Sequence, residues 1–126
     1  RIVQEGRDRA SISGGEMIPP AAEAAEEADA DIELIDVRTI QPNDYEEIVE
    51  SVEKTGRAAI LHEDSKTSGM GAEIASRIQE DAILHMEAPV ERITAPDVPY
   101  PLYTLEDEYM PDNEQVVDGI NEVLEF

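Results

Sequence analysis

The amino-acid sequence predicts an α/β domain with a mostly parallel sheet that is covered by helices on both faces. Helical and strand-like patterns alternate along the chain. The strand-like segments at residues 32–37 and 58–61 are largely apolar, as strands buried on both faces require. The length of 126 residues suits one domain better than two, so we expect a single domain over residues 1–126.

The first three elements are expected before residue 40. Residues 9–14, RASISG, are expected to be the first strand, although Ile12 is their only strong β-former. Residues 17–28 are rich in Ala and Glu and have prolines only near their start, which favours a helix. Residues 32–37, IELIDV, then predict a buried strand.

A second helix is expected after Pro42. Asn43 and Glu46 resemble a capping box, and Gly56 ends the helix. Its apolar residues recur at helical spacing: Tyr45, Ile48, Val49 and Val52. The run AAIL at residues 58–61 follows as a short buried strand.

The second half of the chain repeats the alternation and ends in a helix. Residues 69–83 have an apolar helical face, and residues 90–94, VERIT, predict a strand. Residues 95–112 have no period and hold four of the eight prolines, so we expect an irregular connection or an arm that lies on a partner. Residues 116–124 form an amphipathic C-terminal helix.

Acidic residues dominate the composition. The chain has 31 Asp and Glu against 9 Lys and Arg, a formal net charge of −22. Such a surface repels nucleic-acid phosphates and anionic membranes, so we expect neither partner. We interpret the charge as adaptation to a salty cytoplasm, because salt screens the repulsion. An acidic DNA mimic and an ordinary acidic protein remain as alternatives.

Several other classes of site and location are disfavoured. Cysteine is absent, which excludes disulfides, a thiolate nucleophile and a cysteine-based zinc site. No run reaches membrane-spanning length and no signal peptide is visible, so we expect a cytoplasmic protein. The chain does not begin with Met, which is compatible with a piece of a longer subunit.

The segment LHEDSKTSGMGAEIAS at residues 61–76 holds the first candidate site. His62 ends a strand, where open α/β sheets place ligands, and Glu63 and Asp64 could orient it or hold a cation. The alternative that we favour is that His62 hydrogen-bonds a neighbour and shapes the turn. The glycines of residues 68–71 could offer N–H groups to a phosphate, but the motif matches no phosphate-loop fingerprint and acids flank it.

The remaining polar candidates favour structural roles. His85 has no second ligand at a metal-binding spacing, and Asp36 with Arg38 suggests a local ion pair or a subunit contact. On residue chemistry alone the chain does not resemble a complete enzyme.

Three motifs in fixed order then point to a family: LIDVRTIQPND, GMGAEIA and EAPVERITAPDVPYP. Together they resemble the C-terminal domain of the β subunit of 2-oxoacid dehydrogenase E1 components, of the pyruvate and branched-chain types, within the transketolase-like thiamine enzymes. The resemblance runs from about Gly6 to Phe126. The chain departs from the family at RASISGG, where relatives have a more hydrophobic strand.

The resemblance implies a Rossmann-like three-layer fold with a mostly parallel five-stranded sheet. It implies a role in assembly with an E1 α subunit and a second E1 β subunit in an α2β2 complex, and in docking the peripheral-subunit-binding domain of the E2 acyltransferase. Thiamine diphosphate and Mg²⁺ are implied for the assembled E1, outside this chain. No catalytic, cofactor or metal-binding residue is therefore expected here.

The same resemblance assigns partner-binding residues. Glu87, the acid of the EAP motif, and the terminal carboxylate of Phe126 are expected to meet basic groups of the E2 domain, with Glu91 adding to the acidic patch. His62, Glu63 and Asp64 are expected near a subunit interface. The alternative function is a stand-alone α/β domain that binds a small molecule or a phosphate compound.

Overall fold

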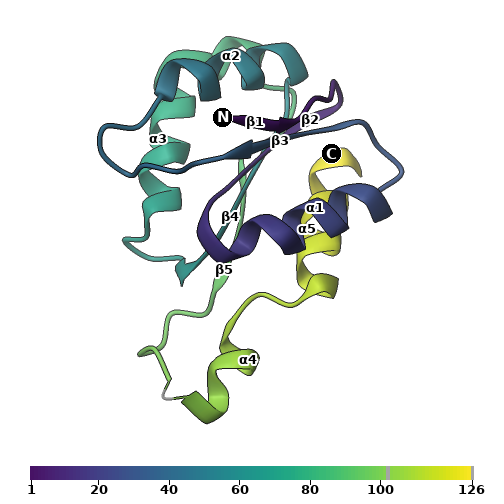
Figure 1. Ribbon diagram of the computed structural model, residues 1–126. Coiled ribbons are helices and arrows are strands. Elements are labelled where there is room, and N and C mark those ends of the chain that lie inside the picture. The colour runs from purple at the N-terminus through teal and green to yellow at the C-terminus, as the bar shows by residue number, and fades with distance from the viewer. Residues whose placement is uncertain (102, 126) are drawn as a thin grey trace.

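Five strands form one sheet in the spatial order β1-β3-β2-β4-β5 (Figure 1). The computed structural model describes residues 1–101 and 103–125. Four strands run parallel, and β1 pairs antiparallel with β3 at one edge. The strands are β1 (Ile2–Gln4), β2 (Arg9–Ser13), β3 (Ile32–Asp36), β4 (Ala58–Ser65) and β5 (Glu91–Ala95). The expected mostly parallel, five-stranded sheet is confirmed.

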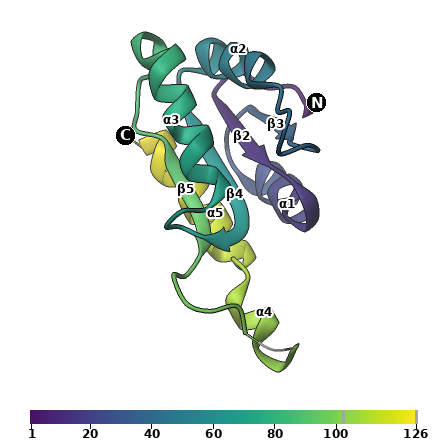
Figure 2. The ribbon, with the colours of Figure 1, turned by 90° about the vertical axis from the view of Figure 1, so that its left-hand side faces the viewer.

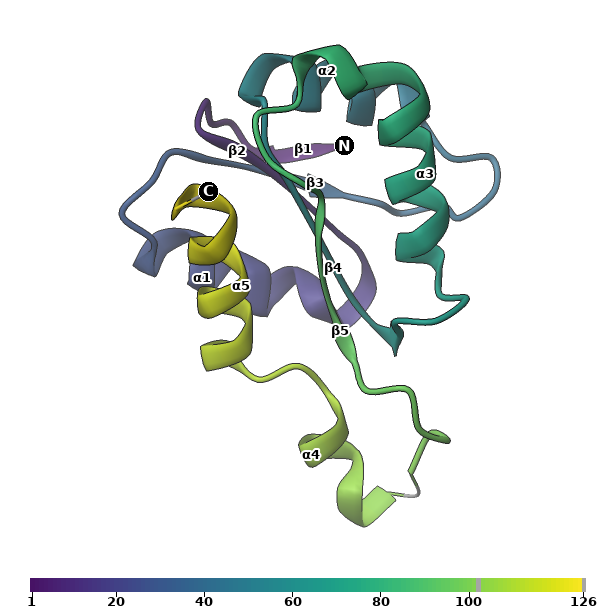
Figure 3. The same ribbon diagram turned by 180° about the vertical axis from the view of Figure 1, so that it is seen from behind.

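Helices cover both faces of this sheet, which confirms the three-layer prediction. On one side α1 (Ile18–Glu27) packs beside α5 (Asn113–Glu125), and on the other α2 (Tyr45–Thr55) packs beside α3 (Met70–Ala82) (Figures 1 and 3). Short 3-10 turns precede α1 and follow α3, at Gly15–Met17 and Ile83–His85.

Two hydrophobic cores lie between the sheet and its helix layers. Alternate strand residues face opposite layers, because successive side chains of a strand point to opposite faces. Below α1 and α5 the buried residues include Leu34, Leu61, Ile93 and Ile120. Below α2 and α3 they include Ile12, Ile35, Ile60, Val52, Ile74 and Ile78. The apolar runs of β3 and β4 are thus explained by burial on both faces.

The central strand is β2, although its sequence is a poor strand former. It pairs with β3 on one side and β4 on the other, and all five of its residues are buried. Arg9, at its start, is fully buried and donates from Nη1 to the carbonyl oxygen of Ile120 in α5. Burial lowers the pKa of Arg9 to about 10. Tertiary context therefore overrides the weak propensity of this segment.

A buried carboxylate joins three parts of the fold. Glu33 of β3 is fully buried and accepts hydrogen bonds from Ser51 and Lys54 of α2 and from the backbone N–H of Gly6. Burial alone would raise the pKa of Glu33. The hydrogen bonds, above all the one from Lys54, together lower the pKa by more than burial raises it, so the net shift is downward. The charged form is thus held in place by donors from α2 and from the loop before β2.

The structure corrects four expectations. The edge strand β1 was not expected. The side chain that caps α2 is Asp44 rather than Asn43: Asp44 Oδ1 accepts from the N–H of Glu47 at 3.3 Å. Strand β4 continues past residue 61 to Ser65. Two short helices, η3 (Tyr103–Leu105) and α4 (Glu106–Tyr109), lie in the connection that was expected to be irregular.

The expected boundaries of the other helices hold to within a few residues. Helix α2 is capped at its end by Gly56. The backbone of Gly56 is left-handed, with φ of 70°, a conformation that glycine commonly adopts at the end of a helix.

The connection between β5 and α5 projects from the carboxyl end of the sheet. In all three ribbon views it extends away from the layers and carries α4 at its far end (Figures 1, 2 and 3). We call residues 96–111 the arm. Among its described residues, the exposed large hydrophobic ones are Val98, Tyr100, Tyr103 and Leu105. The ring of Tyr100 packs edge-on against Tyr109, with centroids 5.0 Å apart.

Candidate functional site

A cavity opens at the carboxyl ends of β2 and β4. From β2 the chain continues to β3 on one side of it, and from β3 it crosses to β4 on the other side. The strand order therefore reverses between β2 and β4. Open α/β sheets bind ligands at the carboxyl ends of strands where the order reverses. The cavity has a volume of about 520 Å³. Its lining includes Ser13, Gly14, His62, Glu63 and Tyr100. The structure thus places the three predicted residues of the His62 loop at the edge of this cavity.

His62 is held by the helix that follows it. Its Nε2 atom accepts a hydrogen bond from the N–H of Gly71 at 3.2 Å, which requires the neutral ring. Burial lowers the pKa of His62, and Arg92 lowers it further, while Asp64 raises it. Within the described residues Nδ1 has no hydrogen-bond partner. The interpretation that His62 hydrogen-bonds a neighbour is confirmed.

The glycines of this loop are explained by close packing. A Cβ atom at Gly71 would lie 2.3 Å from Nε2 of His62, and one at Gly69 would lie 2.2 Å from the carbonyl oxygen of Ser65. Neither position has room for a side chain. The Gly-x-Gly step therefore lets α3 begin directly against the end of β4.

The same contacts weaken the case for a phosphate site at the start of α3. The N–H of Gly71 is used by His62, and that of Ala72 by the carbonyl oxygen of Gly69. Glu63 and Asp64 are exposed beside them, and their charges repel an anion. The stand-alone phosphate-binding alternative gains no support from this geometry.

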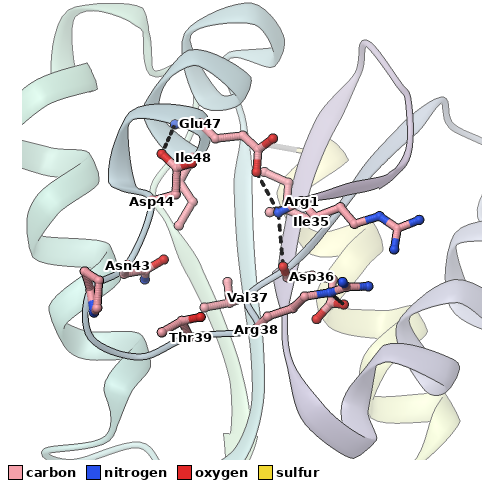
Figure 4. A pocket seen from close by; sticks show the side chains of 11 residues that line it. Arg1, Ile35, Asp36, Val37, Arg38, Thr39, Asn43, Asp44, Glu47 and Ile48 are labelled. Carbon is pink, nitrogen blue, oxygen red and sulfur yellow. Dashed lines mark hydrogen bonds and ion pairs between the residues drawn. The ribbon is translucent and has the colours of Figure 1, made fainter.

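A smaller hollow of about 120 Å³ lies beside the end of β3 (Figure 4). Here Arg38 Nε donates to Asp36 Oδ2 at 2.9 Å, which confirms the expected local ion pair. Figure 4 also shows the side chain of Glu47 reaching the amino group of Arg1, at 2.6 Å. His85 lies outside this hollow. Its Nδ1 atom is 3.4 Å from Oε1 of Glu53, a local contact that agrees with its expected structural role.

Glu87 stands on a fixed corner between α3 and β5. Its N–H donates to the carbonyl oxygen of Gly56 at 2.8 Å, and its side chain packs over Gly56. The side chain of Glu87 is 59% exposed, and its Oε2 atom lies 2.7 Å from Nη1 of Arg57. Arg57 was not predicted as the partner of Glu87, because the two residues are 30 positions apart and no sequence motif links them.

The other two predicted docking residues are Glu91 and Phe126. Glu91 is partly buried and begins β5, next to Ala59 of β4. Phe126 lies outside the described residues. The structure therefore supports a rigid acidic corner at Glu87, with Glu91 as the first residue of the strand that follows it.

Two kinds of feature are absent from the described residues: a cluster of metal ligands and a membrane-spanning helix. Residues 1–101 and 103–125 contain no group of three or more His, Asp or Glu side chains placed to hold a metal ion. None of the helices in this part of the chain combines the length and apolarity needed to cross a membrane.

Comparison with known proteins agrees with the fold. The family model described as the C-terminal domain of transketolase matches residues 1–116. The pyruvate dehydrogenase E1 component subunit beta of Staphylococcus epidermidis is 40% identical over 128 residues, as is that of Staphylococcus aureus. Each alignment covers 99% of this chain and 39% of the relative, so the chain spans about two fifths of the length of these relatives.

A solved structure described as a split-gene transketolase, an inactive beta4 tetramer, superposes with a TM-score of 0.83 at 26% identity. The superposition covers 99% of this chain and 41% of the chain in that structure. The sheet order, the layer arrangement and the family match over residues 1–116 lead to one conclusion: the chain belongs to the transketolase C-terminal domain family.

Proposed function

We propose that this domain assembles and docks the β subunit of a thiamine-diphosphate-dependent 2-oxoacid dehydrogenase E1, in the cytoplasm. The 40% identity to two pyruvate dehydrogenase E1 β subunits supports the choice of enzyme within the family. The reaction of the complete enzyme is the oxidative decarboxylation of pyruvate or a branched-chain 2-oxoacid, with transfer of the acyl group to E2.

The observation that carries the assembly role is the arm. Tyr103 is 91% exposed, and Val98 and Leu105 are each 52% exposed. Ile40, at the same end of the sheet, is 66% exposed. Apolar surface that gathers on a projecting segment is typical of a protein interface. We assign this end of the domain, with His62, Glu63 and Asp64 at its cavity, to contacts with the E1 α subunit and a second E1 β subunit.

The opposite end of the sheet is assigned to docking. Glu87 is fixed by Gly56 and Arg57 and remains more than half exposed, so its charge can meet a cation on a partner without ordering a flexible side chain. We propose that Glu87, Glu91 and the terminal carboxylate of Phe126 bind basic groups of the E2 peripheral-subunit-binding domain.

Thiamine diphosphate and Mg²⁺ do not fit the described residues. The start of α3 is flanked by carboxylates, its amides at Gly71 and Ala72 are already used, and no acidic or histidine cluster is placed to hold a metal ion in the described part of the chain. We therefore assign both groups to other parts of the assembled enzyme. Calorimetry of the 126-residue chain with thiamine diphosphate and Mg²⁺ tests this, and stoichiometric binding would overturn it.

Co-expression of the complete subunit with its α partner tests the assembly role. Light scattering should report an α2β2 complex. An activity assay should show that this complex decarboxylates a 2-oxoacid. Tyr103→Glu should shift this complex toward its subunits, because it places a charge in an apolar interface. Leu84→Glu is the matched control, since Leu84 is 93% exposed but lies outside the arm. An α2β2 complex of unchanged stability in Tyr103→Glu would contradict the assignment.

A further inference from the structure

The outer edge of β5 is open and is bordered by a groove. No other strand lies beyond β5 in the described part of the chain, and the groove beside it has a volume of about 600 Å³. Consecutive residues of β5, from Glu91 to Ala95, line this groove. Because side chains of a strand alternate between faces, lining by consecutive residues means that the groove follows the strand edge itself.

The second wall of the groove is α5. The Cβ that an alanine would add at Gly119 would lie 2.5 Å from Cγ1 of Ile93, so α5 is seated directly on β5. Figure 3 shows β5 running toward the arm and α5 returning from it, alongside the strand. The residues of α5 that line the groove therefore follow the length of β5, and those of α4 lie toward the arm, past the end of the strand.

Carboxylates outnumber cations along this groove. Its acidic residues are Glu91, Asp97, Glu108, Asp118 and Glu122, against Lys66 and Arg92. Asp97 is satisfied by the N–H and hydroxyl of Thr67, and Arg92 donates to the carbonyl oxygen of Lys66. Among the described residues, none of the other four carboxylates lies in an ion pair.

The spacing of these acids favours an extended cation over a metal ion. Within the described part of the chain, no three of them approach closely enough to hold a metal. Asp118 and Glu122 are one helical turn apart on α5, Glu91 begins β5, and Glu108 lies in α4. They form a row along the groove, which suits lysines or arginines repeated along an extended chain.

The two edges of the sheet differ in a way that supports a ligand at only one of them. At the opposite edge β1 has three residues, and its pairing with β3 contains a register irregularity, a common way to block further pairing. Strand β5 offers five residues before Pro96 ends it. Its backbone groups can accept an additional strand, the mode by which many domains bind extended peptides.

We propose that the β5 edge binds an extended, basic peptide segment of a partner protein as a sixth strand, with the basic side chains facing Asp118 and Glu122. Main-chain hydrogen bonds supply the pairing and the row of carboxylates selects for cationic sequences. This site shares only Glu91 with the proposed E2 docking site and does not depend on it.

The probe is an acetylated and amidated peptide of about nine residues with alternating lysine and threonine, long enough to cover β5. Fluorescence anisotropy with the 126-residue chain should give saturable binding in about 0.15 M KCl. Two further peptides carry N-methyl groups on all lysines or on all threonines. When the lysine side chains face α5, the N–H groups of either the lysines or the threonines point toward β5, but not both sets. The peptide that is methylated on the set pointing toward β5 should bind about tenfold more weakly than the other.

The variant Asp118→Lys/Glu122→Lys should weaken binding about tenfold. Its matched control is Glu46→Lys/Glu50→Lys, two exposed acids with the same spacing on α2, which should stay within about twofold. If the first variant does not fold, Asp118→Asn/Glu122→Gln replaces it. Equal binding of both methylated peptides, or equal losses in the two charge variants, would show attraction to the acidic surface as a whole and overturn the proposal.

Discussion

Nη1 of Arg57 lies 2.7 Å from Oε2 of Glu87, and this ion pair joins the turn before β4 to the turn before β5. The carboxylate proposed to meet a cation of a partner is thus already beside a cation of its own chain. Because Glu87 is 59% exposed, the internal pair stabilises the fold only weakly, and its main effect is to fix where the carboxylate lies.

The first prediction concerns docking. Glu87→Lys should weaken binding of the cognate E2 peripheral-subunit-binding domain to the assembled E1 by about 2 kcal/mol or more, because it places two cations together and leaves the partner's cation uncompensated. Glu50→Lys, an exposed acid on α2, should change binding by only a few tenths of a kcal/mol. Calorimetry at the salt concentration that the protein needs compares the two. Equal affinity of Glu87→Lys and the wild type would remove Glu87 from the docking site.

The second prediction follows from the net charge of −22, which we propose is an adaptation to a salty cytoplasm. The midpoint of thermal unfolding should rise from dilute buffer to about 2 M KCl, where the Debye length is below about 3 Å and surface repulsion is screened. Differential scanning calorimetry over a KCl series measures it. A midpoint that stays constant or falls would contradict salt adaptation.

The third prediction concerns the buried carboxylate of β3. Glu33→Gln should lower the free energy of unfolding by about 2–3 kcal/mol, because Lys54 and Ser51 lose a charged acceptor inside the fold. Glu53→Gln is the control, on helix α2, which also carries Ser51 and Lys54. It should change the free energy of unfolding by less than about 0.5 kcal/mol, since Glu53 is exposed. Urea unfolding measures both.

The pH dependence of the same variant has a definite sign. The pKa of Glu33 is lower in the folded state than its ordinary value of 4.5, so its stabilisation is complete above that value and is lost as the pH falls below it. The difference between wild type and Glu33→Gln should therefore be constant at neutral pH and shrink below about pH 4.5. A difference that grows on acidification would contradict the assigned protonation state.

Local patterns predicted the helices well and the centre of the sheet poorly. Helix α2 was visible in the spacing of Tyr45, Ile48 and Val52, since that spacing is set by the helix itself. Strand β2 has almost no intrinsic strand signal, and only its pairing with both β3 and β4 explains its place. Asn43 and Asp44 are both good capping residues, so the sequence alone did not distinguish them.

The candidate sites divide in the same way. The motifs indicated Glu87 and the His62 loop, because each lies within a short recognisable segment. Arg57 beside Glu87 and the row of acids along β5 were missed, since both depend on residues that are distant in sequence. A uniformly acidic chain also hides a local row of carboxylates, because every segment is rich in them.

The last prediction tests the contact between His62 and α3. Gly71→Ala should destabilise the fold by about 2 kcal/mol, since the new Cβ would lie 2.3 Å from Nε2 of His62 and 3.2 Å from Cγ2 of Ile60. His62→Ala alone should also destabilise it, by removing a half-buried ring and its hydrogen bond. In the double variant the clash has no ring to meet, so the loss should be at least about 1 kcal/mol smaller than the sum of the two single losses. Ser76→Ala, on the exposed side of α3, should be neutral or slightly stabilising. Strictly additive losses in urea unfolding would mean that the glycine serves some need other than the close approach of His62.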